Sequence, residues 1–431
     1  MRNLTKTLLK RSLTTSVLCF IFFIAIHNNG YATSKIVNDT IGFNSYKGII
    51  VEANSKKPLE FASLNVNGTN ISTVSNSKGE FLLKVPKKFQ QNSVTVSFLG
   101  YTSKVLSLSE FNDTTTIIQL ETYIEELSEI SIAVKDAPTL VKEVLKRRTE
   151  NYSKDHLVMT AFYREAIKKR KTYVSLSEAI IEINKQPYTN DRNDVLQLYK
   201  SRKSTDYNKL DTVALKHRGG AHSMVRLDVM KNPELLLTED VFQNYKFKFE
   251  NSTKIDNRVI YVVNFKPNQS VEDALFYGKL YIDAQSLALV SAKFELDLSD
   301  IDKAKQFFIL KKPARADVTP ILAKYQVDYR KKGNKWYHNY SRIELGFKIN
   351  WEKKWFNSIY YSTTEMAITD WHKVTDPKNI KQRDRLKSSV ILSDEASGFS
   401  DPEFWGEYNL IEPEKPIHSA IKKIQKQLKK I

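Results

Sequence analysis

The chain has 431 residues, of which 41% are hydrophobic and 27% are charged, and a formal net charge of +18. This length and this hydrophobic content are sufficient for two domains with separate cores. The single cysteine, Cys19, excludes disulfides within the chain and metal sites that need several thiolates.

Residues 1–32 have the pattern of a secretory signal peptide. An apolar run extends from Ser16 to Ile26, and small residues at Gly30 and Ala32 follow it. The run is too short for a membrane span, which needs about 20 residues. No acidic residue precedes it, whereas four basic residues do: Arg2, Lys6, Lys10 and Arg11. We expect cleavage to leave a mature chain from Thr33; the alternative is an uncleaved N-terminal anchor.

Export would change both the cysteine content and the charge of the chain. Cys19 lies inside the apolar run, without the small residues before it that lipid attachment needs, so we expect its removal rather than a lipid anchor. Of the 67 basic residues four lie in the signal, and the remaining 63 against 49 acidic residues give +14. In an exported protein this charge favours anionic lipid headgroups, lipopolysaccharide phosphates or acidic glycans over nucleic acid. The alternative is a solvated basic surface without a specific partner.

Residues 46–134 are expected to form a β-sandwich. Seven or eight short segments of alternating apolar residues follow one another, separated by turn residues. The apolar faces of two of these segments are Phe81, Leu83 and Val85, and Val94, Val96 and Phe98. Such faces are buried between two packed sheets.

The same segment resembles the carboxypeptidase-regulatory-like domain, a transthyretin-like sandwich of Bacteroidetes envelope proteins. The similarity lies in the run from Gly48 to Thr69, the turn from Ser75 to Phe81 and the closing Phe98 to Tyr101. Gly79 and Gly100 stand where turns are expected to need a positive φ. Asn76 replaces the aspartate common at this turn, which argues against calcium binding there. The resemblance implies a regulatory sandwich and no peptidase activity.

Two linkers are expected to flank the sandwich. Residues 33–45 are predicted to be exposed, and residues 135–156 are predicted to contain a helix that marks the domain boundary. Leu140, Val141, Val144 and Leu145 recur at helical spacing, and Pro138 suits a first helical turn.

Residues 157–400 are expected to form a large antiparallel α+β domain, a curved sheet or half-barrel with a few helices, so the predicted fold class is mainly β. Between Val290 and Leu298 apolar residues alternate with Lys293 and Glu295, which gives one apolar and one polar face. The hairpin around residues 283–286 resembles a sequence of the half-barrel lipoprotein carriers of the periplasm. An apolar sheet face needs a cover. A core filled by helices, one of them expected at residues 220–231, and an open lipid cavity both remain as alternatives.

Residues 401–431 are expected to form an extended arm around Trp405, followed by a basic amphipathic helix. The apolar stripe of that helix is Ile421, Ile424, Leu428 and Ile431. It would either dock on the sheet or contact an anionic membrane surface. A transmembrane β-barrel is not expected, because outward apolar bands with aromatic girdles are missing from the strands.

The sequence assigns no catalytic, cofactor-binding or metal-binding residue. It contains no HExxH, no GxSxG and no phosphate-binding glycine loop, and its histidines are scattered singly. We therefore predict that the protein is not an enzyme and needs no cofactor.

The best candidate for a binding site begins at Arg218. Gly219 and Gly220 allow close approach of a ligand, and His222 and Arg226 share one face of a helix. These basic side chains together would hold a phosphate or a carboxylate. The alternative is a plain helix start after a glycine turn.

These features predict an exported, non-enzymatic binding or interaction protein in the periplasm or associated with the outer membrane. The sandwich would contact an envelope protein or an outer-membrane complex, and the large domain would bind an amphiphile or a glycan. Two alternatives remain. One is a glycosidase-like hydrolase that uses dispersed carboxylates, and the other is a purely structural partner of an outer-membrane complex.

Overall fold

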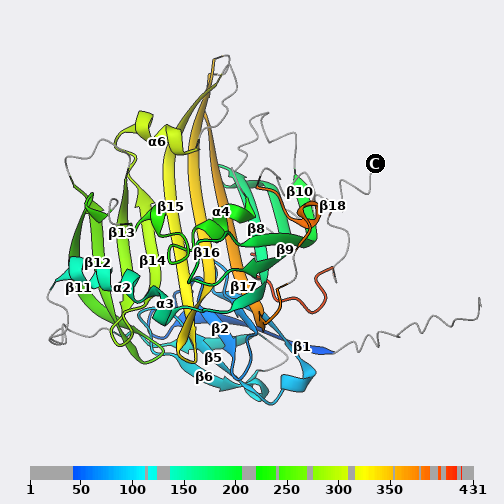
Figure 1. The fold of residues 1–431 in the computed structure, drawn as a ribbon. Helices are drawn as coiled ribbons and strands as arrows, with labels where there is room; N and C mark the ends of the chain where they lie inside the picture. The colour runs from blue at the N-terminus through cyan, green and yellow to red at the C-terminus, as the bar shows by residue number, and fades with distance from the viewer. Residues whose placement is uncertain are drawn as a thin grey trace, which may run out of the picture. The chain divides into compact units, whose positions relative to one another are not determined.

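A computed structural model describes residues 42–111, 115–123, 136–205, 220–238, 242–268, 275–308, 316–352, 355–377, 380–388, 397–398, 404–414 and 419. The predicted mainly β fold class is confirmed (Figure 1). The expected signal peptide, the C-terminal amphipathic helix and the eighth sandwich segment, residues 128–134, lie outside the described residues.

The first part of the fold is the predicted β-sandwich. Its elements are β1 (Phe43–Glu52), β2 (Ser63–Val66), β3 (Ser72–Val74), β4 (Glu80–Pro86), η1 (Lys87–Phe89), β5 (Ser93–Ser97), β6 (Lys104–Ser107), η2 (Leu108–Glu110) and β7 (Thr116–Leu120). One sheet has the order β4-β1-β7 and the other β3-β2-β5-β6. The expected inward faces are buried, including Phe81, Leu83, Val94 and Val96. Alternation at every second residue therefore placed this core correctly.

Two glycines have the conformation that the turns were expected to need. Gly79 has a φ of +72° and Gly100 a φ of +91°. A Cβ at Gly79 would also lie 2.4 Å from the carbonyl oxygen of Ile50, so both backbone conformation and space require glycine there.

The second part is one large open sheet. Its strands and short helices follow in chain order as α2 (Ala137–Lys146), α3 (Arg148–Asn151), β8 (His156–Lys169), β9 (Thr172–Lys185), β10 (Val195–Thr205), α4 (Ala221–Arg226), η3 (Pro233–Leu235), β11 (Tyr245–Ile255), β12 (Arg258–Pro267), β13 (Phe276–Asp283), β14 (Leu289–Leu296), α6 (Ile301–Phe308), β15 (Ala316–Lys332), β16 (Lys335–Trp351), β17 (Ser358–Val374), η4 (Gln382–Asp384) and β18 (Ser397–Gly398). The spatial order is β11-β12-β13-β14-β15-β16-β17-β8-β9-β10-β18. All pairs are antiparallel except β10 with β18.

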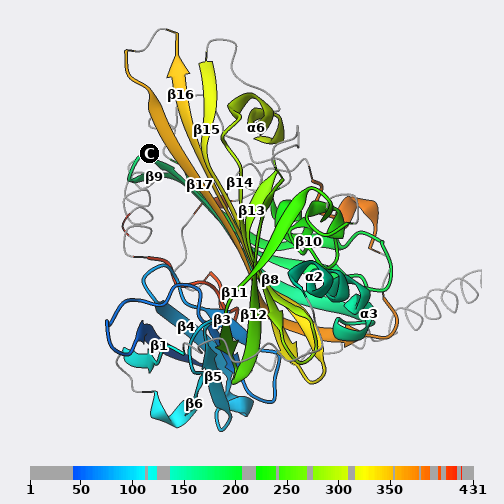
Figure 2. The same ribbon diagram turned by 90° about the vertical axis from the view of Figure 1, so that its left-hand side faces the viewer.

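We call the face of the large sheet that carries Phe294 the inner face. Figure 2 shows α2 and α3 on one side of this sheet. The helix α2 begins after the N-cap Asp136, whose carboxylate accepts a hydrogen bond from the backbone N–H of Thr139, and Pro138 lies in its first turn as expected. Side chains of α2 and of the segment after α4, among them Leu140 and Met230, belong to the same core as the inner face. Over these elements the inner face is filled by protein side chains.

The opposite, outer face is covered at β8, β9, β16 and β17. A cluster of buried residues joins the sandwich, these strands and the arm at residues 404–414: Val74, Phe162, Ile180, Tyr340, Ala367, Trp405, Leu410 and Ile411. Ser72 of the sandwich donates a hydrogen bond to the carbonyl of Ile368 at 2.9 Å. The central strands are thus buried on both faces.

Among the described helices, none combines the length and apolar character that crossing a bilayer would require.

The packing of Trp405 in the arm at residues 404–414 leads to a testable prediction. Trp405 is 4% exposed and packs edge-on against Phe162, with ring centroids 5.9 Å apart. We expect Trp405→Ala to lower the free energy of unfolding by about 3–5 kcal/mol, because it opens a cavity in a closed cluster. Denaturant unfolding measures this. Trp355→Ala, at a tryptophan that is 98% exposed, is the matched control and should change stability by less than about 0.5 kcal/mol. Equal effects of the two substitutions would contradict this description of the arm.

Candidate functional site

A groove of about 560 Å³ lies on the outer face of the large sheet. Its floor consists of residues from β12 to β16, and Glu60 and Phe61 of the sandwich form one wall. We call this space the groove.

Strand alternation explains which side chains reach the groove. In β13, Gly278, Leu280 and Ile282 belong to the inner side, so Tyr277, Lys279 and Tyr281 point to the outer side. In β14 the same alternation places Lys293 and Glu295 in the groove, and in β15 and β16 it adds Lys324 and Arg342. The outer face here is a row of aromatic and charged groups.

The groove brings like charges together. Lys279 and Lys293 are direct partners in the register of β13 and β14. Like charges directly opposite each other destabilise a sheet unless anions compensate them. Lys279 has such a partner, because its Nζ lies 2.6 Å from a carboxylate oxygen of Glu250. Among the ion pairs of the described residues none includes Lys293, although the buried carboxyl of Asp328 attracts it.

The other two cations on the floor of the groove, Lys324 and Arg342, are paired with carboxylates. The ammonium of Lys324 lies 2.9 Å from a carboxylate oxygen of Glu295. Arg342 forms ion pairs with Glu344 and Glu365. These pairs fix the side chains of Lys324 and Arg342 in place. Lys293, whose Nζ lies 6.0 Å from the centroid of the Tyr281 ring, is thus the groove cation that we consider for an anion from solution.

Aromatic rings border the charged floor. Phe61 stacks on Tyr340 with a centroid distance of 5.3 Å, and the guanidinium of Arg342 lies 4.5 Å from the centroid of the Phe61 ring. Tyr277 is 43% exposed and donates a hydrogen bond to Glu295. Burial raises the pKa of Tyr281 to about 12, helped by Glu250 and Asp328, so its hydroxyl stays neutral and can donate a hydrogen bond. The groove thus combines ring faces with donors and a cation.

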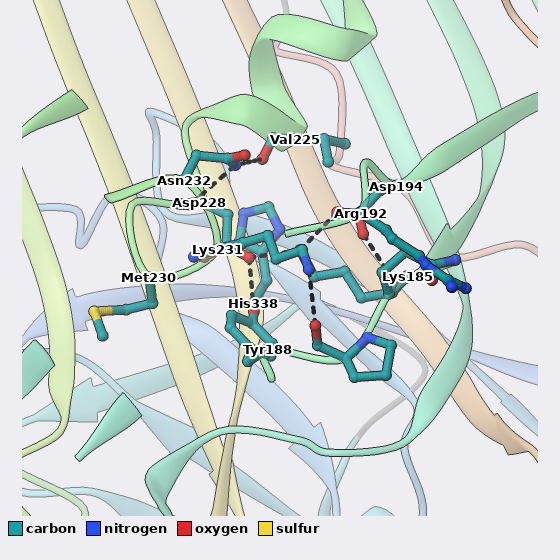
Figure 3. Close-up of polar contacts among 12 residues, drawn as sticks. Lys185, Tyr188, Arg192, Asp194, Val225, Asp228, Met230, Lys231, Asn232 and His338 are labelled. Atoms are coloured by element: carbon teal, nitrogen blue, oxygen red, sulfur yellow. Dashed lines mark hydrogen bonds and ion pairs between the residues drawn. The ribbon is translucent and has the colours of Figure 1, made fainter. Parts of the chain in front are cut away.

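A second polar cluster lies on the inner side, beneath α4 (Figure 3). Asp228 follows α4 and accepts hydrogen bonds from Lys185 at 2.6 Å, Tyr188 at 2.6 Å and Tyr329 at 2.8 Å. Lys185 also donates to Asp194 at 2.8 Å. We call these residues, together with His338, the Asp228 cluster.

Burial and charge fix the protonation states in the Asp228 cluster. Burial alone would raise the pKa of Asp228, but Lys185 and the hydrogen bonds lower it to about 2. Burial lowers the pKa of His338 to about 4, so the imidazole is neutral near pH 7. Burial and the nearby Asp228 raise the pKa of Tyr188 well above its usual value. The cluster therefore holds one ammonium between carboxylates.

We interpret the Asp228 cluster as an anchor of the fold rather than a ligand site. Asp228 and Lys185 are both buried, and each hydrogen-bonds to other protein groups. Lys231 donates to the carbonyl of Pro187 at 2.7 Å from the same segment. Mutually satisfied buried charges fix one chain segment to another. Here they attach the segment after α4 to β9 through Lys185 and to β15 through Tyr329.

Of the three predicted binding residues, the two that the structure describes, His222 and Arg226, do not line the groove. Arg218 lies outside the described residues. His222 is half-buried in α4, and its Nε2 lies 2.7 Å from the carbonyl oxygen of Leu386. Arg226 is exposed at the last position of α4. The segment at 218–226 remains a prediction, and α4 packs next to β16 and β17 on the inner side.

Sequence reasoning missed the groove although its signal was present. The alternation of Tyr277, Lys279 and Tyr281 with apolar residues was available, but such a row also describes an ordinary solvated strand face. The sequence also contained no sign that Arg164 is buried. Its side chain is 2% exposed, and its guanidinium lies 2.7 Å from a carboxylate oxygen of Glu178.

Comparisons with known proteins identify the first domain. Residues 46–132 match the model of the CarboxypepD_reg-like domain, as the sequence resemblance implied. No curated protein matches the chain.

Three solved structures have low similarity to the chain. A LolA superfamily protein from Nitrosomonas europaea is 10% identical with a TM-score of 0.23, over 60% of this chain and 100% of its own. A DUF1329 family protein from Desulfovibrio piger is 10% identical with a TM-score of 0.26, over 57% and 96%. Lipovitellin is 9% identical with a TM-score of 0.28, over 59% and 29%. At these scores the similarities support no functional inference.

The anchoring role of the Asp228 cluster predicts a large effect of one substitution. Asp228→Asn should lower the free energy of unfolding by about 3 kcal/mol, because it removes a buried charge partner of Lys185. Asp191→Asn is the matched control, since Asp191 is exposed and lies 3.8 Å from Arg148. Asp191→Asn should lower the free energy of unfolding by less than about 1 kcal/mol. Denaturant unfolding of both variants measures the difference, and a mild effect of Asp228→Asn would argue against an anchor.

The lowered pKa of His338 predicts how the free energy of unfolding depends on pH. Its pKa is lowered from 6.5 to about 4 in the folded state, so between these values the unfolded chain binds more protons. The stability that neutral His338 contributes is present above pH 6.5 and is lost as the pH falls toward 4, by up to about 3 kcal/mol. His338→Gln should flatten the unfolding free energy over this pH range. His372→Gln, at an exposed histidine, is the matched control for the loss of an imidazole.

Proposed function

We propose that the protein is a non-catalytic binding protein of the bacterial cell envelope that holds an anionic glycan in the groove. The observation that carries this proposal is the direct pairing of Lys279 with Lys293 beside the exposed ring of Tyr277. Glu250 compensates the first lysine, and a bound anion would compensate the second.

The chemistry of the groove suits a sugar that carries acidic groups. Sugar rings present C–H faces that pack on aromatic rings, and Tyr277, Tyr281 and Phe61 offer such rings along the groove. Sugar hydroxyls need donors and acceptors, which the tyrosine hydroxyls and the paired carboxylates supply. A volume of about 560 Å³ is in the range of small-ligand sites. An open polar groove fits a segment of a chain better than an enclosed apolar molecule.

Two further features support an envelope role. The N-terminal sequence has the pattern of a signal peptide, and residues 46–132 match a CarboxypepD_reg-like domain. We assign contacts with envelope proteins to the sandwich surface away from the groove. The amphiphile considered from the sequence receives less support, because Met224, Met230 and Leu237 fill the inner face beneath α4 and η3.

The experiment is a titration of purified protein with oligogalacturonate, an acidic glycan, and with maltodextrin, a neutral one, by isothermal calorimetry. We expect binding of the acidic glycan to weaken as the salt concentration rises. Lys293→Gln should weaken it about tenfold, the loss of one charge-assisted hydrogen bond. Tyr277→Ala should weaken it by a similar factor by removing a stacking ring.

The matched control is Lys104→Gln, which removes an exposed lysine of β6 in the sandwich and should not alter binding. If Lys104→Gln and Lys293→Gln weakened glycan binding equally, the binding would depend on the net charge of the protein and not on the groove. No binding of acidic or neutral glycans under low salt would refute the proposed function.

A glycosidase-like activity is the second candidate, because the groove also contains carboxyl groups. Glu60 and Glu344 interact electrostatically, and desolvation raises the pKa of Glu60 although Arg342 opposes the shift. Glycoside hydrolysis uses two carboxyl groups in one cleft, one as the general acid and the other as the base or nucleophile. Incubation with oligogalacturonate followed by a reducing-end assay decides between the two. Product that forms with the wild type and disappears with Glu60→Gln would establish the enzyme.

A further inference from the structure

The hairpin between β16 and β17 ends in two aromatic side chains that contact little else. Trp355 is 98% exposed and Phe356 is 82% exposed. The other strongly exposed apolar residues include single side chains in the sandwich, such as Val105 and Ile117 at 62% each. A fully exposed tryptophan next to a phenylalanine at the end of a hairpin calls for a partner.

The hairpin projects because its strands are long. β15, β16 and β17 each have 17 residues, whereas the neighbouring β13 and β14 have eight. Figures 1 and 2 show the ends of these long strands reaching beyond the rest of the sheet. The register places Trp351 opposite Ala316, the first residue of β15, so the aromatic pair lies beyond the last paired rung. Among the described residues, the two rings therefore lie past the last paired residues of β16 and β17, Ile349 and Ser358.

The same end of the sheet carries a basic turn. Lys169 at the end of β8 pairs with Tyr360, two residues after the start of β17, so the turn between β8 and β9 lies beside the hairpin. The turn and its flanks consist of Lys168, Lys169, Arg170 and Lys171. Arg170 is tied to the hairpin, because its backbone N–H donates to the carbonyl of Ile359 at 2.8 Å. Four adjacent basic residues thus lie behind the aromatic tip.

We propose that this end of the sheet binds an anionic phospholipid surface, with Trp355 and Phe356 inserted at the level of the headgroups. Tryptophan and phenylalanine partition into the interfacial region of a bilayer, where the indole N–H keeps a polar partner. The basic turn would meet the lipid phosphates, each cation near the surface adding to the attraction. Charge complementarity selects a lipid surface as the occupant, because an apolar protein partner would not need four basic residues beside the rings.

This proposal is independent of the glycan proposal. The groove is lined by residues of β12–β16 and the sandwich turn, and none of the tip or basic-turn residues lines it. Loss of glycan binding and loss of lipid binding can therefore be measured on separate variants.

The experiment is vesicle flotation of purified protein. The vesicles contain either phosphatidylcholine alone or phosphatidylcholine with phosphatidylglycerol. We expect flotation with the anionic vesicles and little with the neutral ones. Trp355→Ser and Phe356→Ser should each weaken the apparent partition coefficient by about tenfold, because each removes one ring from the apolar contact. The double variant should abolish flotation.

Two further variants separate the apolar contribution to lipid binding from the electrostatic one. Ile117→Ser removes an exposed apolar side chain from the sandwich and should leave flotation unchanged. Arg170→Gln combined with Lys171→Gln should weaken binding to the anionic vesicles, and added salt should have less effect on this variant. Circular dichroism and the melting temperature, unchanged in all variants, exclude unfolding as the cause.

The depth of insertion gives an independent readout. Bromine-labelled phosphatidylcholine in the anionic vesicles should quench tryptophan fluorescence of the wild type, and Trp355→Phe should remove most of the quenching while flotation persists. The proposal is overturned if the double serine variant floats as the wild type does, which would assign lipid contact to another part of the chain. It is also overturned if the wild type fails to float with anionic vesicles at low salt.

Discussion

The arrangement of this protein depends on one buried carboxylate. Glu178 of β9 is fully buried between the guanidinium groups of Arg164 and Arg202, each 2.7 Å away. Burial would raise its pKa, but the two arginines lower it below the usual value, so Glu178 stays ionised. A buried charge of this kind is tolerated only with well-placed partners. Arg164 also donates to the carbonyl of Ile411 at 2.7 Å and thereby holds the arm against the outer face of the sheet.

The arm in turn holds the sandwich, and the sandwich forms the wall of the groove. Thr73 donates to the carbonyl of Leu410 at 3.0 Å, and the side chain of Asn409 exchanges hydrogen bonds with the backbone of Lys84. Once the sandwich is fixed in this way, Phe61 stacks on Tyr340 and bounds the groove. The groove is therefore built by three parts of the chain that lie far apart in sequence. A change in the arm would reach the groove through packing, without any contact of its own with a ligand.

Alternation and turn chemistry predicted the strands, the sandwich core and the positive φ of Gly79 and Gly100, because these depend on residues that are neighbours in sequence. The groove could not be predicted in the same way. Its lysine pair depends on which residue of β14 stands opposite Lys279, and its wall depends on docking of the sandwich. The burial of Arg164 could not be predicted from local sequence either, since its partners Glu178 and Ile411 come from another strand and from the arm. Long-range pairing decided the site, while local pattern decided the fold.

Burial of the central strands on both faces also explains where binding surfaces can exist. Strands β8, β9, β16 and β17 face a filled core on one side and the sandwich and arm on the other. The central residues of these strands are therefore not accessible to a ligand. Among the described residues, two of the regions without this double cover bear on binding. The outer face of β13 and β14 lies beyond the reach of the arm, and the long strands end past their neighbours at Trp355. A wide sheet must be covered to be stable. Its uncovered aromatic and basic side chains do not contribute to the core, so they can serve in binding without loss of stability.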